Sequence, residues 1–196
     1  MKTSLSLATV RAHARTALAV VAPDEKHVIR TSRLLMRPVN QTDFDDYFEL
    51  LSDPAVMKFI GIKTGRVLGR DEVFDLVEEA IKGWDVRGWG RWSIFTHDGE
   101  FIGFCGFRVE QGLPELLTVF HERFWADGIA AEASIKCIEY GRKVFGFGEI
   151  NAFTNPAHFR AHNLLKKIGA IFQGNVDFHG IVGSKYTFPN VNAAAA

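Results

Sequence analysis

The chain has 196 residues, the length of one large domain, and its 47% hydrophobic and 23% charged content is ordinary for a protein that buries a core. Its 23 basic and 23 acidic residues give a formal net charge of zero, which lacks the basic excess of proteins that bind nucleic acid or anionic membranes. No apolar run approaches the roughly 18 residues of a membrane-spanning helix. We expect a globular domain with no nucleic-acid partner and no membrane partner.

The two ends of the chain lack the pattern of a packed domain. Residues 1–22 are rich in Ala, Ser and Thr and carry basic residues but no acid, a composition that overlaps a mitochondrial presequence. We favour a flexible extension over residues 1–26, a domain over 27–190 and an uninformative tail over 191–196. The cytoplasm is the expected location, and targeting to an organelle through residues 1–22 is the alternative.

The two cysteines, Cys105 and Cys137, both lie in apolar patterns. Two such thiols do not form a disulfide framework, so a reducing compartment is the simpler assumption. We interpret both as small buried hydrophobic residues rather than nucleophiles.

The first part of the domain predicts one strand and two helices. The strand covers 28–38 and ends at a proline. Thr42 and Asp45 have the spacing of a capping box at the start of the first helix, which stops at 52–54. Apolar residues at helical spacing over 73–84 predict the second helix.

The second part predicts a three-strand meander followed by a mixed segment. The meander has strands at 91–96, 101–109 and 115–120, joined by turns that contain glycine. The mixed segment has a long helix, a strand, a shorter helix and two closing strands, at 129–145, 150–153, 161–168, 171–178 and 185–188. Since no repeat and no linker divides this order, we predict a single α+β domain whose mixed, mostly antiparallel sheet is flanked by helices.

The turn between strand 115–120 and helix 129–145 is a candidate anion site. A helix N-terminus presents unpaired N–H groups and the positive end of the helix dipole. Gly128 and its small neighbours Ala126 and Ala130 let a phosphate approach the backbone. One glycine is weak evidence alone, and an ordinary strand-to-helix connection is the alternative.

Several short motifs follow one another at a spacing that goes beyond this turn. The densest is Phe-Trp-Ala-Asp-Gly-Ile-Ala-Ala-Glu-Ala at 124–133, and the others are TSRLLMRP, RWSI, FIGFCGF, NPA and KIGA, at 31–38, 91–94, 101–107, 155–157 and 167–170. Together they resemble the GNAT acetyltransferases, in particular the branch that includes the ribosomal-protein N-terminal acetyltransferases. The densest motif is similar to that branch's Trp-x-x-Gly-x-Ala-x-Glu-Ala signature.

The resemblance implies a GNAT-type sheet that splays between strands 115–120 and 150–154. Acetyl-CoA is the implied cosubstrate, with its pantetheine amides on the strand that ends at Phe120 and its pyrophosphate on the backbone of 126–131. The residues expected to contact it are Val119, Phe120, His121, Ala126, Asp127, Gly128, Ile129, Ala130, Ala131, Asn155 and His158.

Two departures from the family pattern concern this cofactor site. Ala126 and Asp127 stand where the family often has Gly and then Gln, Lys or Arg, and Asp127 is a candidate helix cap when the site is empty. His158 and Ala161 stand where Asn and Ser are common. We expect weaker or differently shaped cofactor binding, and a CoA-binding partner module without catalysis is the alternative function.

The implied reaction is transfer of an acetyl group to a primary amine by direct attack, without a covalent enzyme intermediate. Glu115 is the leading candidate for removing the amine proton, and a solvated carboxylate at the strand start is the alternative. The backbone N–H near Phe120 is the implied donor to the thioester oxygen. Tyr186 is the candidate for protonating the leaving thiolate, with a packed or surface tyrosine as the alternative.

The acceptor is not defined by these motifs. A protein N-terminus and a small-molecule amine are both compatible with the motifs as acceptors. A homodimer is also compatible with them. Phe59, Trp84, Trp89 and Trp92 are candidate walls of the acceptor cleft, although aromatic residues more often fill a core. His158 and His162 have the i, i+4 spacing of metal ligands, but no third ligand is evident, so we expect no metal.

Overall fold

The computed structural model describes residues 25–61 and 65–190 of the chain. The predictions for the N-terminal extension and the C-terminal tail therefore fall almost wholly outside the described residues. Within the described part of the chain, no helix is both long and apolar enough to cross a membrane.

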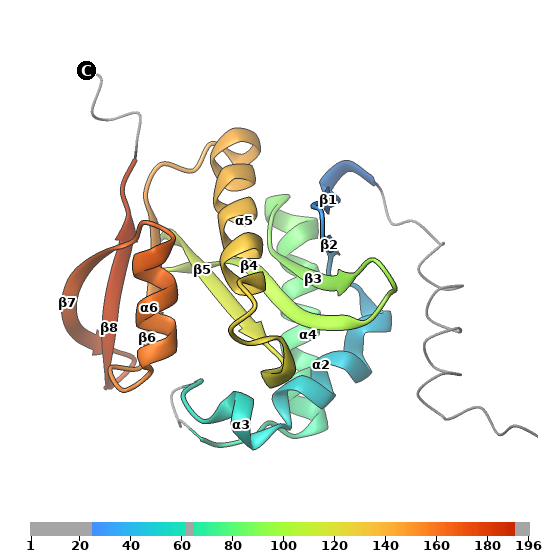
Figure 1. Ribbon diagram of the computed structural model, residues 1–196, viewed down its shortest axis with the longest axis horizontal. Helices are drawn as coiled ribbons and strands as arrows, with labels where there is room; N and C mark the ends of the chain where they lie inside the picture. The colour runs from blue at the N-terminus through green and yellow to red at the C-terminus, as the bar shows by residue number, and fades with distance from the viewer. Residues whose placement is uncertain (1–24, 62–64, 191–196) are drawn as a thin grey trace, which may run out of the picture.

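One eight-stranded sheet forms the centre of the molecule, in the order β1-β2-β3-β4-β5-β6-β8-β7 (Figure 1). The strands are β1 (Ile29–Arg30), β2 (Leu34–Pro38), β3 (Arg91–Thr96), β4 (Phe101–Glu110), β5 (Leu113–Phe120), β6 (Ile150–Thr154), β7 (Ile171–Phe178) and β8 (Ile181–Phe188). The helices are η1 (Glu25–His27), η2 (Gln41–Asp43), α2 (Phe44–Leu51), α3 (Pro54–Met57), α4 (Arg70–Arg87), η3 (Glu122–Phe124), α5 (Ile129–Phe145) and α6 (Phe159–Lys167).

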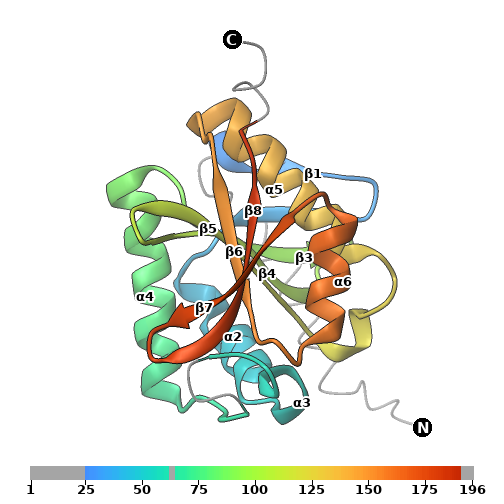
Figure 2. The same ribbon diagram turned by 90° about the vertical axis from the view of Figure 1, so that its left-hand side faces the viewer.

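Helices cover both faces of this sheet. Helices α5 and α6 lie on one face, whereas α2 and α4 lie on the other, and Figure 2 shows α4 and α6 on opposite sides of the strands. A separate cluster of buried apolar side chains fills each interface. Helix α5 packs close to the strands because its inner face carries small residues such as Ala133, Cys137 and Gly141. A Cβ atom at Gly141 would lie 3.1 Å from the Phe107 ring.

The sheet opens between its two central strands. All neighbouring strands are antiparallel except β5 and β6, which are parallel and share a single residue pair, Glu115 with Asn151. Beyond this pair the two strands diverge toward their carboxyl ends. The structure thus confirms the α+β class and the mostly antiparallel sheet that splays at its centre.

Two local predictions in the first part of the domain were wrong, and one short helix was not predicted. The strand expected over 28–38 is a hairpin of β1 and β2, because the Thr31 hydroxyl accepts hydrogen bonds from the N–H groups of Arg33 and Leu34 and turns the chain. The predicted stop at 52–54 is confirmed, because α2 ends at Leu51. The short helix α3 that follows was not predicted; the Asp53 side chain caps it by accepting a hydrogen bond from the Ala55 N–H.

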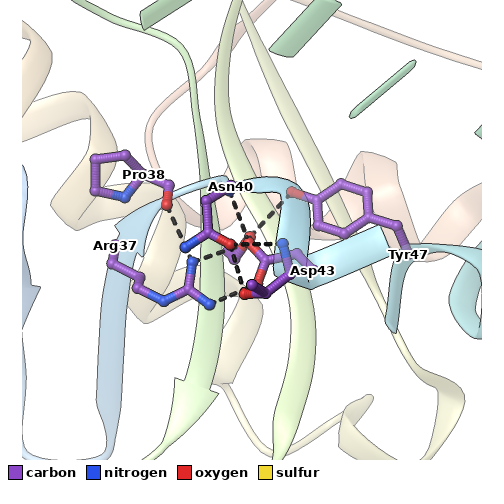
Figure 3. Close-up of polar contacts among 7 residues, drawn as sticks. Arg37, Pro38, Asn40, Asp43 and Tyr47 are labelled. Carbon is purple, nitrogen blue, oxygen red and sulfur yellow. Dashed lines mark hydrogen bonds and ion pairs between the residues drawn. The ribbon is translucent and has the colours of Figure 1, made fainter. Parts of the chain in front are cut away.

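The second error concerns the cap of the first helical segment, which is formed by Asn40 and Asp43 rather than Thr42 and Asp45. The Asp43 carboxylate is buried and receives two hydrogen bonds from Arg37, one from the Asn40 N–H and one from Ser93 Oγ (Figure 3). A buried carboxylate is tolerated only with such partners. This network joins β2, β3 and the start of α2, so it holds the α2 side of the sheet in place.

Candidate active site

Strand β5 divides its side chains between the two cores, as the twofold alternation of a strand requires. Leu116 and Phe120 point to the α5 face, where the Thr118 hydroxyl also lies 3.0 Å from Ser134 Oγ on that helix. Leu117 and Val119 point to the face of α2 and α4. Glu115 is two residues from Leu117, so its carboxylate lies on this second face.

The backbone of β5 alternates in the same way. The His121 N–H donates to the Ile102 carbonyl at 3.0 Å, so the odd-numbered residues of this strand pair with β4. The N–H and C=O groups of Leu116, Thr118 and Phe120 therefore face the gap toward β6. The Phe120 carbonyl is occupied by the Trp125 indole N–H at 2.9 Å, which leaves the Phe120 N–H directed at the gap.

This alternation separates the three residues expected to bind pantetheine. Phe120 presents a backbone donor to the gap, whereas the backbone groups of Val119 and His121 are turned to β4. Val119 contributes its side chain to the wall of a cavity instead. His121 is buried beside Phe101, with the two ring centroids 6.0 Å apart.

A cavity of about 400 Å³ lies where β5 and β6 diverge. Both strands line it, together with residues from the α5, α6 and α4 sides of the sheet, so it passes through the sheet from one face to the other. On the α5 face it is lined by residues such as Leu116, Thr118, Ser134, Ala152, Ala161 and Leu165. A passage of this kind lets two molecules meet from opposite faces.

Glu115 lies in the wall of this cavity and is only 1% exposed, which excludes the interpretation of a solvated carboxylate at a strand start. Its Oε2 accepts a hydrogen bond from Arg108 Nε at 2.5 Å. Burial raises the pKa of Glu115 above its ordinary value, and the neighbouring Arg108 guanidinium opposes that effect without cancelling it. The carboxylate thus has the position and the raised pKa typical of a proton acceptor.

Two arginines that the sequence analysis did not single out share this face with Glu115. Arg108 lies on β4 directly opposite Glu115 on β5. Arg91 on β3 also lines the cavity. Arg91 is buried and donates to Glu79 at 3.1 Å and to the Leu76 carbonyl at 3.4 Å. The strand register could have revealed Arg108, whereas Arg91 begins the RWSI motif but nothing near it in the sequence places it beside Glu115.

The loop expected to hold the pyrophosphate keeps its backbone donors available. Helix α5 begins after Gly128, whose φ of 76° is left-handed and which supplies no side-chain cap. The N–H groups of Ile129, Ala130 and Ala131 in the first turn have no carbonyl one turn earlier to bind. This is the arrangement that binds an anion at a helix start.

Asp127 does not form the helix cap that the sequence suggested, and Ala126 beside it has an unusual backbone conformation. Asp127 is exposed and does not cap α5, and its carbonyl accepts a hydrogen bond from Arg33 at 2.9 Å. Arg33 also pairs with Glu132 at 2.5 Å, so a cation crosses the start of the helix. Ala126 has a φ of 74°, a left-handed conformation that is costly for a residue with a side chain.

His158 and Asn155 line the other side of the cavity. The Asn155 side chain accepts a hydrogen bond from the Ala157 N–H at 2.8 Å and so fixes the turn before α6. The His158 ring stacks on Phe59 with the centroids 4.8 Å apart, and burial lowers its pKa. The His158 imidazole, which is larger than the Asn common at this position in the family, therefore reaches across the cavity toward Phe59, just after α3.

Tyr186 lies apart from this cavity. Its side chain is buried on the α6 face, and its hydroxyl is 2.6 Å from His162 Nδ1. His162 Nε2 is 3.2 Å from the Pro156 carbonyl, which can only accept, so the ring links Tyr186 to the turn before α6. This geometry matches the packed tyrosine and does not favour the acid role.

The remaining aromatic and thiol candidates divide between wall and core. Phe59 lines the cavity, but Trp84 and Trp92 pack in the core at 4.8 Å from each other. Cys105 and Cys137 are free and buried, as predicted.

The sequence pattern that defines the acetyltransferase (GNAT) domain matches residues 33–171. The chain belongs to the GNAT acetyltransferase family. The Bacillus subtilis (strain 168) protein YkkB, which is described as uncharacterized, is 32% identical over 145 residues, covering 71% of this chain and 82% of that protein. Membership of this family makes the protein an acetyl-CoA-dependent acyltransferase, as the motifs predicted.

Solved structures share the fold at low sequence identity. The ribosomal L7/L12 alpha-N-protein acetyltransferase RimL, in complex with coenzyme A, has a TM-score of 0.69 at 14% identity, over 84% of this chain and 98% of that one. The spermidine N-acetyltransferase from Vibrio cholerae, in complex with CoA and spermine, has a TM-score of 0.64 at 13% identity, over 81% of this chain and 96% of that one. These likenesses show that the GNAT fold is shared.

Proposed function

We propose that this protein transfers the acetyl group of acetyl-CoA directly to a primary amine, with Glu115 as the group that takes the amine proton. The acceptor is a small-molecule amine or a protein N-terminus, and the two free, buried thiols fit a cytoplasmic location. The observation that supports the proposal most is the buried Glu115 in the wall of a cavity that crosses the sheet.

The backbone around the cavity fits the cosubstrate. The first-turn N–H groups of α5 suit a pyrophosphate, and the gap-facing N–H and C=O of Thr118 suit an amide of a pantetheine arm. Asn155 and His158 would lie along the same arm. Acetyl-CoA supplies the thioester carbonyl when it is bound.

The chain's own residues then have three tasks. The cavity walls on the α2 and α4 face hold the acceptor so that its nitrogen meets the carbonyl carbon. Glu115 accepts the proton that the nitrogen loses as the C–N bond forms and the C–S bond breaks. The Phe120 N–H, which points into the gap, donates to the oxygen on which negative charge develops. The leaving thiolate takes its proton from water.

A single substitution tests this assignment. We expect Glu115→Gln to lower kcat/KM for amine acetylation by about 10²- to 10⁴-fold, measured as release of free CoA. CoA affinity, measured by calorimetry, should not change, because Glu115 lies on the face opposite α5.

The matched control is Glu110→Gln, which removes a neighbouring carboxylate that does not line the cavity. This variant should retain activity. If the wild-type protein and the Glu115→Gln variant both bind CoA but acetylate no amine in a broad panel, the protein is a CoA-binding module instead.

A further inference from the structure

We infer that the acceptor is a hydrophobic monoamine, an amine on an alkyl or aryl body without a second cationic group. This inference rests on the proposed function and specifies the substrate class. It comes from the part of the cavity on the α2 and α4 face, where Glu115 lies.

The wall of this part of the cavity is apolar. Its lining includes Leu51, Met57, Phe59, Leu68, Leu76 and Phe104, which come from α2, α3, α4, the loops between them and β4. Phe178 and Ile181, at the tip of the β7–β8 hairpin, line the same cavity. An acceptor gains binding free energy here by burying carbon, at about 25 cal/mol for each Å² removed from water.

The charges in this wall disfavour a second ammonium group. Among the lining residues in the described part of the chain, Glu115 is the one carboxylate, and it is already bonded to Arg108. The other ionised groups are the guanidinium groups of Arg91 and Arg108, which repel a cation. A buried charge without a partner is strongly unfavourable, and a di- or polyamine would find no free carboxylate for its second charge among the described lining residues.

The size of the cavity sets the scale of the acceptor. The volume of about 400 Å³ is near the lower end for small-molecule sites and must also accommodate the end of the acyl donor. A body of several carbons or one aromatic ring suits the space that remains.

A pair of amines with the same number of heavy atoms isolates the second charge. 1-Aminohexane and 1,5-diaminopentane differ in having a methyl group or a second amine at the far end. We expect the wild-type enzyme to acetylate 1-aminohexane with a kcat/KM at least roughly tenfold higher than for 1,5-diaminopentane, since a hydrophobic pocket discriminates even one methylene by about 10- to 200-fold and burial of an unpaired charge costs more. An equal or higher kcat/KM for the diamine would overturn the inference.

A matched pair of variants tests whether this wall causes the preference. Leu68→Glu places a carboxylate in the lining at a half-buried site, whereas Val67→Glu places it at the adjacent exposed site outside the lining. We expect Leu68→Glu to shift the ratio toward the diamine by about tenfold and Val67→Glu to leave it unchanged. Equal ratios in both variants would contradict the role of this wall.

The same assays separate failure of the inference from failure of the proposed function. If CoA binds but neither amine, nor any other amine in the panel, is acetylated, the proposed function fails. If amines are acetylated and the diamine is preferred, the inference alone fails.

Discussion

Arg108 faces Glu115 across the β4–β5 hairpin, with its Nε 2.5 Å from Glu115 Oε2. The pKa of Glu115 is therefore subject to two opposing effects. Burial raises the Glu115 pKa, while the Arg108 charge lowers it, and burial is the larger effect. Arg108 also lies 3.8 Å from Glu110, so it bridges the cavity wall and the outer end of the hairpin.

Replacing Arg108 should therefore change the pH dependence of the reaction. The base works only when ionised, so activity falls as the pH drops through the Glu115 pKa. In Arg108→Gln the lowering effect of the cation is lost and the pKa rises further, so the acidic limb of the kcat/KM profile should move to higher pH.

An Arg108→Lys control retains the positive charge without the planar guanidinium group. It should keep the acidic limb of the kcat/KM profile close to its wild-type position. A profile that drops in height at all pH values, with no shift of the limb, would show that Arg108 only supports the fold.

Tyr186→Phe separates the packed role of Tyr186 from the acid role. The hydroxyl is bonded to His162 and lies away from the cavity, so we expect kcat to stay within about twofold of wild type. Loss of this hydrogen bond should lower the free energy of unfolding by about 1 kcal/mol, measured by urea denaturation. A fall in kcat of a hundredfold or more would restore the acid role.

Ala126→Gly should stabilise the protein. The left-handed φ of 74° costs a residue with a side chain on the order of 1–2 kcal/mol, and glycine avoids this cost but loses part of the gain to its freer unfolded chain. We expect the free energy of unfolding to rise by about 0.5–1 kcal/mol. The opposite sign is expected for Ala130→Gly, which places glycine inside helix α5.

Asp43→Asn should be among the more destabilising changes on the α2 side of the sheet. It leaves the largely buried Arg37 guanidinium without its carboxylate, and breaking a buried ion pair costs about 3–5 kcal/mol. Ser93→Ala removes one hydrogen bond to Asp43 and should cost about 1 kcal/mol. A loss below 1 kcal/mol for Asp43→Asn in urea denaturation would show that Arg37 finds another partner.

Much of the fold could be predicted from periodicity, because its long elements carry strong patterns. Strands 91–96 and 171–178 and helix 129–145 were predicted at the bounds that the structure shows. Short elements fixed by single side chains were missed, since one hydroxyl at Thr31 or one carboxylate at Asp53 does not form a period. Strand β8 begins four residues earlier than predicted, because its first half, residues 181–184, has no regular alternation of apolar and polar side chains.

The candidate site was predictable only in part. Glu115 and the α5 start followed from the motifs, but their environment depends on contacts between distant strands. Arg108 is an exception, because a two-residue turn at Gln111 and Gly112, both with positive φ, joins the two strands. Residues at equal separations along the chain before and after this turn face each other, so Arg108 is predicted opposite Glu115. Arg91 comes from a strand whose distance to Glu115 depends on the whole sheet, so no local pattern indicates it.

The single residue pair between β5 and β6 also affects how the protein exchanges its amide hydrogens. Thr118 and Phe120 lie in the middle of an eight-stranded sheet, yet their N–H groups face the gap rather than a neighbouring strand. Exchange with deuterium is therefore expected to be fast at these two amides and slow at Val119, which pairs with β4. A ligand that fills the gap would slow the two fast amides, so they would report occupancy before any acceptor is known.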